Sequence, residues 1–137
     1  MAISMSVPVL LVIEDELPLL EAIVVKARQN GFEVVSGRSV AEGIEMLKSI
    51  SSVDAVWVDH FLPDQIGLEL VKFMRKDKRW KTTPIFLVTN AVEPEIVNQY
   101  LKADVQGYYT KVLMSLQDIV FDIKARLTST TEQSKVA

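Results

Sequence analysis

The sequence contains no cysteine and a single histidine, His60. The lack of cysteine excludes disulfides, thiolate metal sites and a cysteine nucleophile, and one histidine leaves no cluster of histidine ligands. No apolar run approaches the ~20 residues that span a bilayer. The first such run, Val7–Ile13, follows no positive charge and leads directly into acidic residues, unlike a secretory signal peptide. With 15 basic and 18 acidic residues, no global charge favours nucleic acid or an anionic membrane. We therefore expect a cytoplasmic protein.

What is present suffices for one globular domain. The 137 residues are 49% hydrophobic and 24% charged, which is ordinary for a folded chain with a buried core. Short apolar runs alternate with helical patterns, and this alternation predicts an α/β fold, a parallel sheet with helices on both faces and right-handed crossovers. Strands are predicted at residues 7–13, 32–36, 53–58, 85–89 and 105–110. Helices are predicted at about residues 18–29, 40–50, 66–76, 93–102 and 116–127.

The domain is predicted to extend over residues 7–127, after an N-terminal extension at residues 1–6. From Thr128 the chain becomes polar, so we expect residues 128–137 to be a frayed tail or the start of a linker.

Several residues predict where helices begin and end. Ser39 with Glu42 three residues later is a capping-box pattern, and Ser115 is expected to cap the last helix. The pair Asn30-Gly31 is expected to end the first helix.

The stretch Val53–Gly67 organises the predicted site, and the other functional residues are expected to lie around its carboxylate, Asp59. It opens as an apolar run, typical of a strand buried on both faces, and that strand ends at Asp59. Pro63 and Gly67 follow in a loop before a helical pattern begins. Open parallel sheets bind ligands at the carboxyl ends of their strands, which is where Asp59 is predicted to lie.

Three other strands also end in chemically useful groups. Glu14 and Asp15 follow the first strand, Thr89 ends the fourth and Lys111 follows the fifth. In a parallel sheet these ends share one edge, so three carboxylates gathered there need a cation. Oxygen ligands without cysteine or histidine favour a hard ion such as Mg²⁺. With a hydroxyl and a lysine to hold oxyanion charge, the set suggests phosphoryl transfer onto an aspartate.

With these residues the chain resembles the receiver domain of two-component response regulators, over about residues 7–127. The family's motif positions occur in order: an acidic pair, a phosphoacceptor followed by proline and glycine, a hydroxyl, an aromatic ring and a lysine. They are Glu14 and Asp15 in LLVIEDE, Asp59, Pro63 and Gly67 in DHFLPDQIG, Thr89 in FLVTNA, and Tyr108 and Lys111 in GYYTK. Each signal is weak alone, but together and in this order they are specific. The resemblance implies a flavodoxin-like (βα)5 fold with strand order 2-1-3-4-5.

The resemblance also implies roles at the strand ends. Asp59 would accept a phosphoryl group from a phosphohistidine on a sensor histidine kinase or a histidine phosphotransfer protein. Asp15, Asp59 and the backbone carbonyl of Phe61 would bind Mg²⁺, with Glu14 acting directly or through water. Lys111 would pair with Asp59 at rest and with the phosphoryl group afterwards. Such a protein is a phosphoacceptor with weak autocatalytic phosphotransfer and autodephosphorylation, not a conventional enzyme.

The implied output is a switch. Thr89 would move to hydrogen-bond a phosphoryl oxygen, and Tyr108 would turn inward into the space that Thr89 leaves. This coupled shift would change the face formed by the fourth helix, fifth strand and fifth helix, and so control binding of a downstream protein. The sequence does not identify that target, and it leaves homodimer formation open.

Four positions depart from the family's usual pattern. Val112 stands where a proline normally follows the lysine, so we expect either a trans bond with a rearranged loop or a strained cis bond. Asn90 stands where a smaller residue is usual and is expected to narrow access to the phosphoryl group. Glu14 replaces the commoner aspartate, which favours a looser or water-mediated metal contact. Asp104 stands where a helix-ending glycine is usual and must adopt that backbone geometry.

Two other functions remain open. A degenerate receiver used only as a docking module fits Val112 and Asn90, although Asp59, Thr89 and Lys111 argue against it. An aspartate-based phosphatase or phosphotransferase would carry a second acid two residues after the nucleophile, where Phe61 stands. His60 is interpreted as a solvent-edge residue that modulates hydrolysis.

The basic segment at residues 75–81 is interpreted as a solvated helix end and not as a nucleic-acid site. Trp80 within it is expected to pack over the loop or to mark a contact with a partner.

Overall fold

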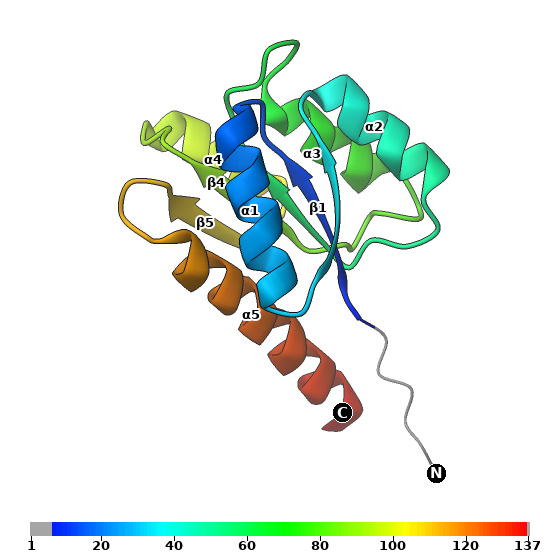
Figure 1. The fold of residues 1–137 in the computed structure, drawn as a ribbon. Helices are drawn as coiled ribbons and strands as arrows, with labels where there is room; N and C mark the ends of the chain where they lie inside the picture. Colours follow the sequence, from blue (N-terminus) through cyan, green and yellow to red (C-terminus); the bar gives the residue numbers. More distant parts are fainter. Residues whose placement is uncertain (1–6, 137) are drawn as a thin grey trace.

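In a computed structural model of the chain, residues 7–136 are described, with side chains to residue 128, so the N-terminal extension at residues 1–6 lies outside the described part. Five strands form one parallel sheet in the order β2-β1-β3-β4-β5, which confirms the predicted flavodoxin-like topology (Figure 1). The strands are β1 Val9–Ile13, β2 Glu33–Gly37, β3 Ala55–Val58, β4 Ile85–Thr89 and β5 Gly107–Thr110. The helices are α1 Leu17–Gln29, α2 Val40–Ser49, α3 Gly67–Lys76, α4 Pro94–Lys102 and α5 Leu116–Val136.

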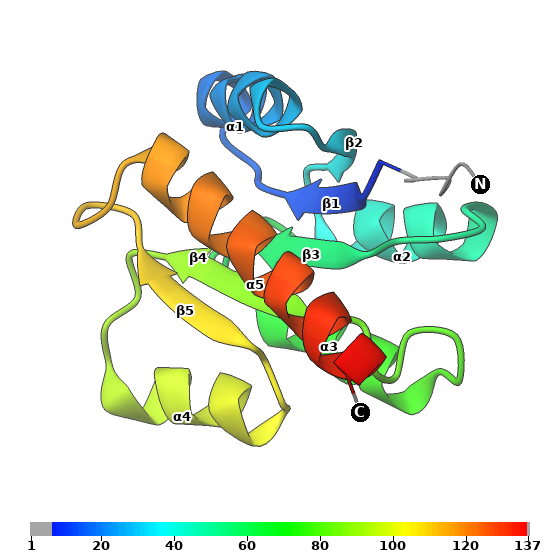
Figure 2. The ribbon, with the colours of Figure 1, turned by 90° about the horizontal axis from the view of Figure 1, so that it is seen from below.

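The apolar strands separate two hydrophobic cores, because side chains alternate between the faces of the sheet. Leu11 and Ile13 of β1 point to a core completed by α2, α3 and α4, and Leu10 and Val12 point to one completed by α1 and α5. Figure 2 shows α1 and α5 on one side of the sheet and α3 and α4 on the other. All residues of β3 and β4 are buried, as expected for central strands covered on both faces.

Most helix ends follow the predicted signals. Ser39 Oγ accepts a hydrogen bond from the Glu42 backbone N–H at 3.1 Å, and Ser115 Oγ accepts one from Asp118 at 3.1 Å. The Glu42 carboxylate differs from a strict capping box: it accepts a bond from the Arg38 backbone N–H at 3.3 Å. These side chains satisfy N–H groups that have no partner inside the helix.

Helices α1 and α4 end in the same way with different residues. Gly31 has φ +91° after α1, and Asp104 has φ +62° after α4. In α4 the Val105 N–H bonds to the Tyr100 carbonyl at 3.3 Å and the Asp104 N–H to the Leu101 carbonyl at 3.1 Å, which is a Schellman ending. The prediction that Asp104 adopts the geometry of a helix-ending glycine is therefore confirmed.

Two segments outside the sheet differ in part from their prediction. Helix α5 continues through residues 128–136 to Val136, where the sequence predicted a frayed tail or the start of a linker, and the linker stays a prediction. No glycine or proline occurs between Thr128 and Val136 to end the helix. In the segment at residues 75–81 the exposed basic side chains agree with a solvated helix end; they are Lys76, Lys78, Arg79 and Lys81. Trp80 is buried in the core, however, and Arg75 binds neighbouring backbone carbonyls. No helix within the described residues is long and apolar enough to cross a membrane.

Candidate functional site

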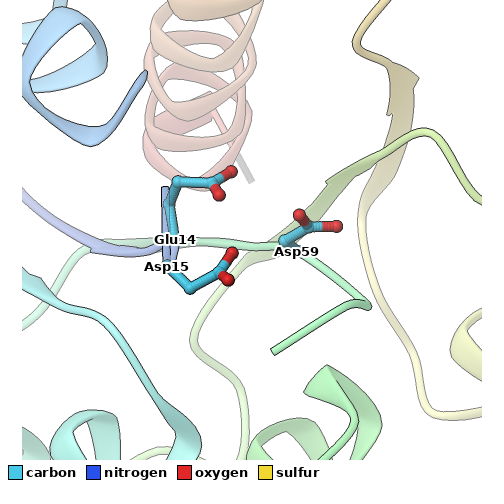
Figure 3. Close-up of side chains that lie close together, drawn as sticks. All are labelled: Glu14, Asp15 and Asp59. Carbon is cyan, nitrogen blue, oxygen red and sulfur yellow. The ribbon is translucent and has the colours of Figure 1, made fainter. Parts of the chain in front are cut away.

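Three carboxylates meet at the carboxyl edge of the sheet. Glu14 and Asp15 directly follow β1, Asp59 directly follows β3, and these strands are neighbours with Ile13 opposite Val58. One oxygen from each of the three acids lies within 4.8 Å of the others, and Figure 3 shows the Glu14 and Asp15 side chains beside that of Asp59. Glu14 and Asp59 are buried, whereas Asp15 is half-buried. The structure therefore brings together the acids that the sequence predicted to converge.

Lys111 joins this cluster from the other side of β4. Its Nζ donates to Asp59 Oδ2 at 2.7 Å and to Glu14 Oε1 at 2.6 Å. The predicted contact with Asp59 is present, and the contact with Glu14 is one that sequence reasoning missed. The Lys111 backbone N–H also bonds to the Thr89 carbonyl at 3.2 Å, which places the lysine at the end of β4.

Burial and charge act against each other in the cluster. Burial raises the pKa of Glu14, and the nearby Lys111 ammonium offsets this only in part. Burial acts to lower the pKa of Lys111, but the hydrogen bonds that its ammonium donates to Asp59 and Glu14 outweigh this effect, so that pKa is raised. A single ammonium facing three carboxylates leaves excess negative charge, which a cation would neutralise.

The donor set fits a hard divalent ion. All three side chains offer oxygen, and the part of the chain that the structure describes places no histidine or cysteine in the cluster. Mg²⁺ prefers such ligands and keeps several waters in its shell. Asp15, Asp59 and Glu14 are therefore the residues that would hold it. A role for the Phe61 carbonyl stays a prediction; the Phe61 side chain is exposed, and its N–H lies 3.4 Å from Asp59 Oδ1.

Thr89 and Tyr108 are connected through one residue of the loop after β4. Thr89 is fully buried, and its Oγ1 accepts a hydrogen bond from the Ala91 N–H at 3.2 Å. Tyr108 is half-buried, and its hydroxyl donates to the Ala91 carbonyl at 2.8 Å. Both side chains therefore hold the same residue, although they belong to different strands.

His60 is not at the solvent edge, so that interpretation is wrong. It is only 6% exposed, and its Nδ1 lies 2.8 Å from the Tyr100 hydroxyl of α4. Burial lowers the pKa of His60, against the nearby carboxylates of Asp59 and Glu93. No local pattern signals this contact, because Tyr100 is forty residues away along the chain.

The remaining departures have limited structural effect. Every peptide bond within the described residues is trans, so Lys111-Val112 takes the trans alternative, and Val112 is 76% exposed. Asn90 is exposed, while Thr89 beside it is buried. The predicted narrowing of access by Asn90 stays a prediction.

Two supporting residues were missed by sequence reasoning. The Asp64 carboxylate, in the loop after Asp59, accepts bonds from the Val40 N–H at 3.0 Å and the Ala41 N–H at 2.9 Å at the start of α2. Desolvation acts to raise the pKa of Asp64, but these backbone donors outweigh it and lower the pKa. The Arg38 guanidinium donates to the Asp15 carbonyl at 2.8 and 3.1 Å. A carboxylate after proline in a loop is a weak turn signal, and nothing in the sequence marks Arg38.

Comparison with known proteins agrees with this geometry. Residues 10–123 match the family described as the response regulator receiver domain. The chain is 28% identical over 116 residues to the phosphate regulon transcriptional regulatory protein PhoB of Klebsiella pneumoniae, covering 85% of this chain and 50% of that protein. It is 31% identical over 103 residues to the chemotaxis protein CheY1 of Helicobacter pylori, covering 74% and 83%. A CheY-like receiver domain structure from Methanospirillum hungatei matches with a TM-score of 0.84 at 22% identity, covering 93% of this chain and 99% of that chain.

The extent of these matches decides what they show. The chain spans about half the length of the PhoB relatives that it matches. The family match, in contrast, covers the sheet from β1 to β5 and most of its helices. Receiver domains are phosphoacceptors of two-component systems and not conventional enzymes. The chain belongs to the response regulator receiver domain family.

Proposed function

We propose that this receiver domain is a phosphorylation-activated switch in which Asp59 accepts the phosphoryl group. The observation that carries the proposal is the Lys111 ammonium, which lies 2.7 Å from Asp59 inside a cluster of three acids. An isolated surface aspartate would have neither a half-buried cationic partner nor two further carboxylates beside it. This arrangement is suited to a carboxylate nucleophile with its counter-charges already in place.

The donor is a phosphohistidine on a sensor histidine kinase or a histidine phosphotransfer protein. An oxygen of Asp59 forms a bond to phosphorus while the bond from phosphorus to the imidazole nitrogen breaks. The bonding electrons stay on that nitrogen, which leaves as neutral imidazole once it is protonated. Lys111 then pairs with the new phosphoryl oxygens in place of the Asp59 carboxylate.

Mg²⁺ is the cofactor of this proposal, held by Asp15 and Asp59 with the Phe61 carbonyl, and by Glu14 directly or through water. When bound, it supplies positive charge to the phosphoryl oxygens in transfer and in hydrolysis. Glu14 and Asp15 contribute by holding charge at the site, and Arg38 by fixing the backbone at Asp15. Weak autocatalytic phosphotransfer from small donors and slow autodephosphorylation follow from the same groups.

Signal output uses Thr89 and Tyr108. Thr89 turns so that its hydroxyl donates to a phosphoryl oxygen. This breaks the hydrogen bond that the Ala91 N–H donates to Thr89 Oγ1 in the unphosphorylated protein. Ala91 also holds the Tyr108 hydroxyl, so both side chains rearrange together. The face formed by α4, β5 and α5 then changes its affinity for a downstream protein or a second copy of the domain. Cytoplasmic location remains a prediction.

Intact-mass measurement after incubation with acetyl phosphate and Mg²⁺ tests the proposal. We expect one added phosphoryl group, absent in Asp59→Asn and present in Asp64→Asn. Asp64 is the matched control, because it lies in the same loop and asparagine keeps one of its two acceptor oxygens for the α2 backbone.

The other outcomes separate the alternatives. No added mass on a folded protein would favour the docking module. Consumption of many donor molecules per minute by each protein molecule would favour an aspartate-based phosphatase or phosphotransferase.

A further inference from the structure

Helix α4 buries only one side chain fully, while Ile96 packs against the same core half-buried. Among the residues of Pro94–Lys102, all of which the structure describes, Tyr100 alone is buried. In comparison, α3 buries Gly67, Leu68, Leu70, Val71 and Met74. The position of α4 therefore depends strongly on what surrounds Tyr100, because Tyr100 is the side chain that the helix buries most deeply.

The hydroxyl of Tyr100 contacts the phosphoacceptor loop, residues 59–66 between β3 and α3. Its hydroxyl lies 2.8 Å from Nδ1 of His60, the residue next to Asp59. The two rings pack edge to face, with centroids 5.6 Å apart and planes at 77°. Both side chains are buried, so water does not compete for this hydrogen bond.

Helix α3 begins against the same hydroxyl. A Cβ added to Gly67 would lie 3.1 Å from Tyr100 Oη and 2.1 Å from the Asp59 carbonyl oxygen, so only glycine fits there. The Gly67 N–H also bonds to the His60 carbonyl at 3.0 Å. Burial raises the pKa of Tyr100, which keeps its hydroxyl protonated and able to donate. The phosphoacceptor loop, the start of α3 and α4 therefore converge on one buried hydroxyl.

This contact differs from the connection through Thr89. That connection passes from Thr89 through Ala91 to Tyr108 and ends on β5. The His60–Tyr100 bond instead leads from the residue beside Asp59 directly to α4. The two connections share no residue.

We propose that the His60–Tyr100 hydrogen bond is a second coupling between the phosphoacceptor and α4, separate from Thr89 and Tyr108. His60 and Tyr100 are positioning residues: they hold α4 in its unphosphorylated position, and a shift of the loop at Asp59 releases it. The inference rests on the proposed function. By thermodynamic reciprocity, a partner that displaces α4 also changes the phosphorylation equilibrium at Asp59.

Hydrogen exchange of α4 amides tests the coupling, measured by mass spectrometry with and without acetyl phosphate and Mg²⁺. In the unphosphorylated protein, Tyr100→Phe removes the buried hydrogen bond to His60, along with the contact of the hydroxyl with the Leu68 backbone, and keeps the ring. We therefore expect the α4 amides to exchange about fivefold faster. In this variant phosphorylation should cause little further increase in the exchange rate of the α4 amides, while the mass increase from phosphorylation of Asp59 is retained. His60→Leu should behave as Tyr100→Phe does. His60→Asn, whose side chain places a polar atom near the position of Nδ1, should restore most of the parent behaviour.

Tyr109→Phe is the matched control. Tyr109 is also buried and also loses a hydroxyl hydrogen bond, but its partner is Asp122 of α5. We expect α4 exchange in this variant to stay as in the parent. Combining Tyr100→Phe with Thr89→Ala should remove more of the phosphorylation response than Thr89→Ala alone.

The failures are distinguishable. If the parent gains a phosphoryl group and Tyr100→Phe keeps the full phosphorylation-dependent change in α4, the coupling is overturned and the proposed function stands. If Tyr109→Phe has the same effect on α4 as Tyr100→Phe, the effect is general loosening and the coupling is also overturned. If the folded parent gains no phosphoryl group, both proposals are overturned.

Discussion

Lys111 and Arg75 lie at opposite edges of the same sheet and face different acceptors. Lys111, after the carboxyl end of β5, donates to the carboxylates of Glu14 and Asp59. Arg75, near the amino ends of β4 and β5, donates to backbone carbonyls and one side-chain amide. Its acceptors are the carbonyls of Trp80, Lys81, Thr83, Ala103 and Asp104, and Oε1 of Gln106.

The two surroundings have opposite electrostatic consequences. Burial acts to lower the pKa of both cations, but the two carboxylates raise that of Lys111. For Arg75 burial prevails over the opposing charge of Asp104, and the pKa is lowered. Neutral carbonyls satisfy the N–H donors of the guanidinium but bring no acidic group to this place, so Arg75 is suited to structure. The carboxylates around Lys111 keep excess negative charge that a metal ion can neutralise.

Removing Arg75 should have the largest effect. Arg75→Ala leaves several partly buried carbonyls without a donor, and we expect the free energy of unfolding to fall by about 3 kcal/mol. Arg75→Lys should recover little of this, because an ammonium lacks the planar fork. Urea denaturation measures both variants. Phosphoryl uptake by the folded fraction should be unchanged, and a loss of uptake would contradict a purely structural role.

Removing Lys111 should act on chemistry. Lys111→Met is expected to slow phosphoryl uptake from acetyl phosphate about 100-fold, because one charged donor to the phosphoryl oxygens is lost. The variant also leaves buried carboxylates unpaired, so Mg²⁺ should stabilise it more than it stabilises the parent. Thermal unfolding with and without Mg²⁺ checks this. Arg75→Ala should show no such extra stabilisation; if it does, the distinction between the two cations fails.

Glu14 sharpens the comparison through pH. Its pKa in the folded state is raised above the unfolded value, so its contribution to stability is present below the unfolded pKa and lost as pH rises through the folded pKa. Without Mg²⁺, Glu14→Gln should therefore be more stable than the parent at neutral pH. This gain should vanish below about pH 4, where the carboxyl is protonated in both states. Urea denaturation at several pH values measures the difference in unfolding free energy between Glu14→Gln and the parent. A stability gain that grows as pH falls would contradict the raised pKa of Glu14.

The smallest effect is expected at Asp104, whose carbonyl accepts from Arg75 at 2.9 Å. Asp104→Gly relieves the positive φ while keeping that carbonyl, and we expect about 0.5 kcal/mol of added stability. Gly31→Ala, at the equivalent end of α1, should destabilise instead. Thermal unfolding of the two variants in parallel measures both changes in stability. If both substitutions stabilise, or both destabilise, backbone geometry is not the cause.

The sequence by itself determined the order of strands and helices and the residues at the strand ends. Both follow from local information: apolar period, proline and glycine positions, and motif spacing between Asp59, Pro63 and Gly67. The convergence of Glu14, Asp15 and Asp59 was also predictable, because parallel strands bring their carboxyl ends to one edge.

Only the tertiary structure decided which partners the side chains found. The burial of His60 depends on Tyr100 of α4, and the second hydrogen bond of Lys111 depends on Glu14 after β1. The role of Arg75 depends on carbonyls from two separate segments, at residues 80–83 and 103–104. Such contacts join residues far apart in the chain, and their geometry is set by packing of whole elements on the sheet. Local sequence patterns contain no information about that packing. They therefore identified the chemical groups of the site but not the buried hydrogen bonds that position them.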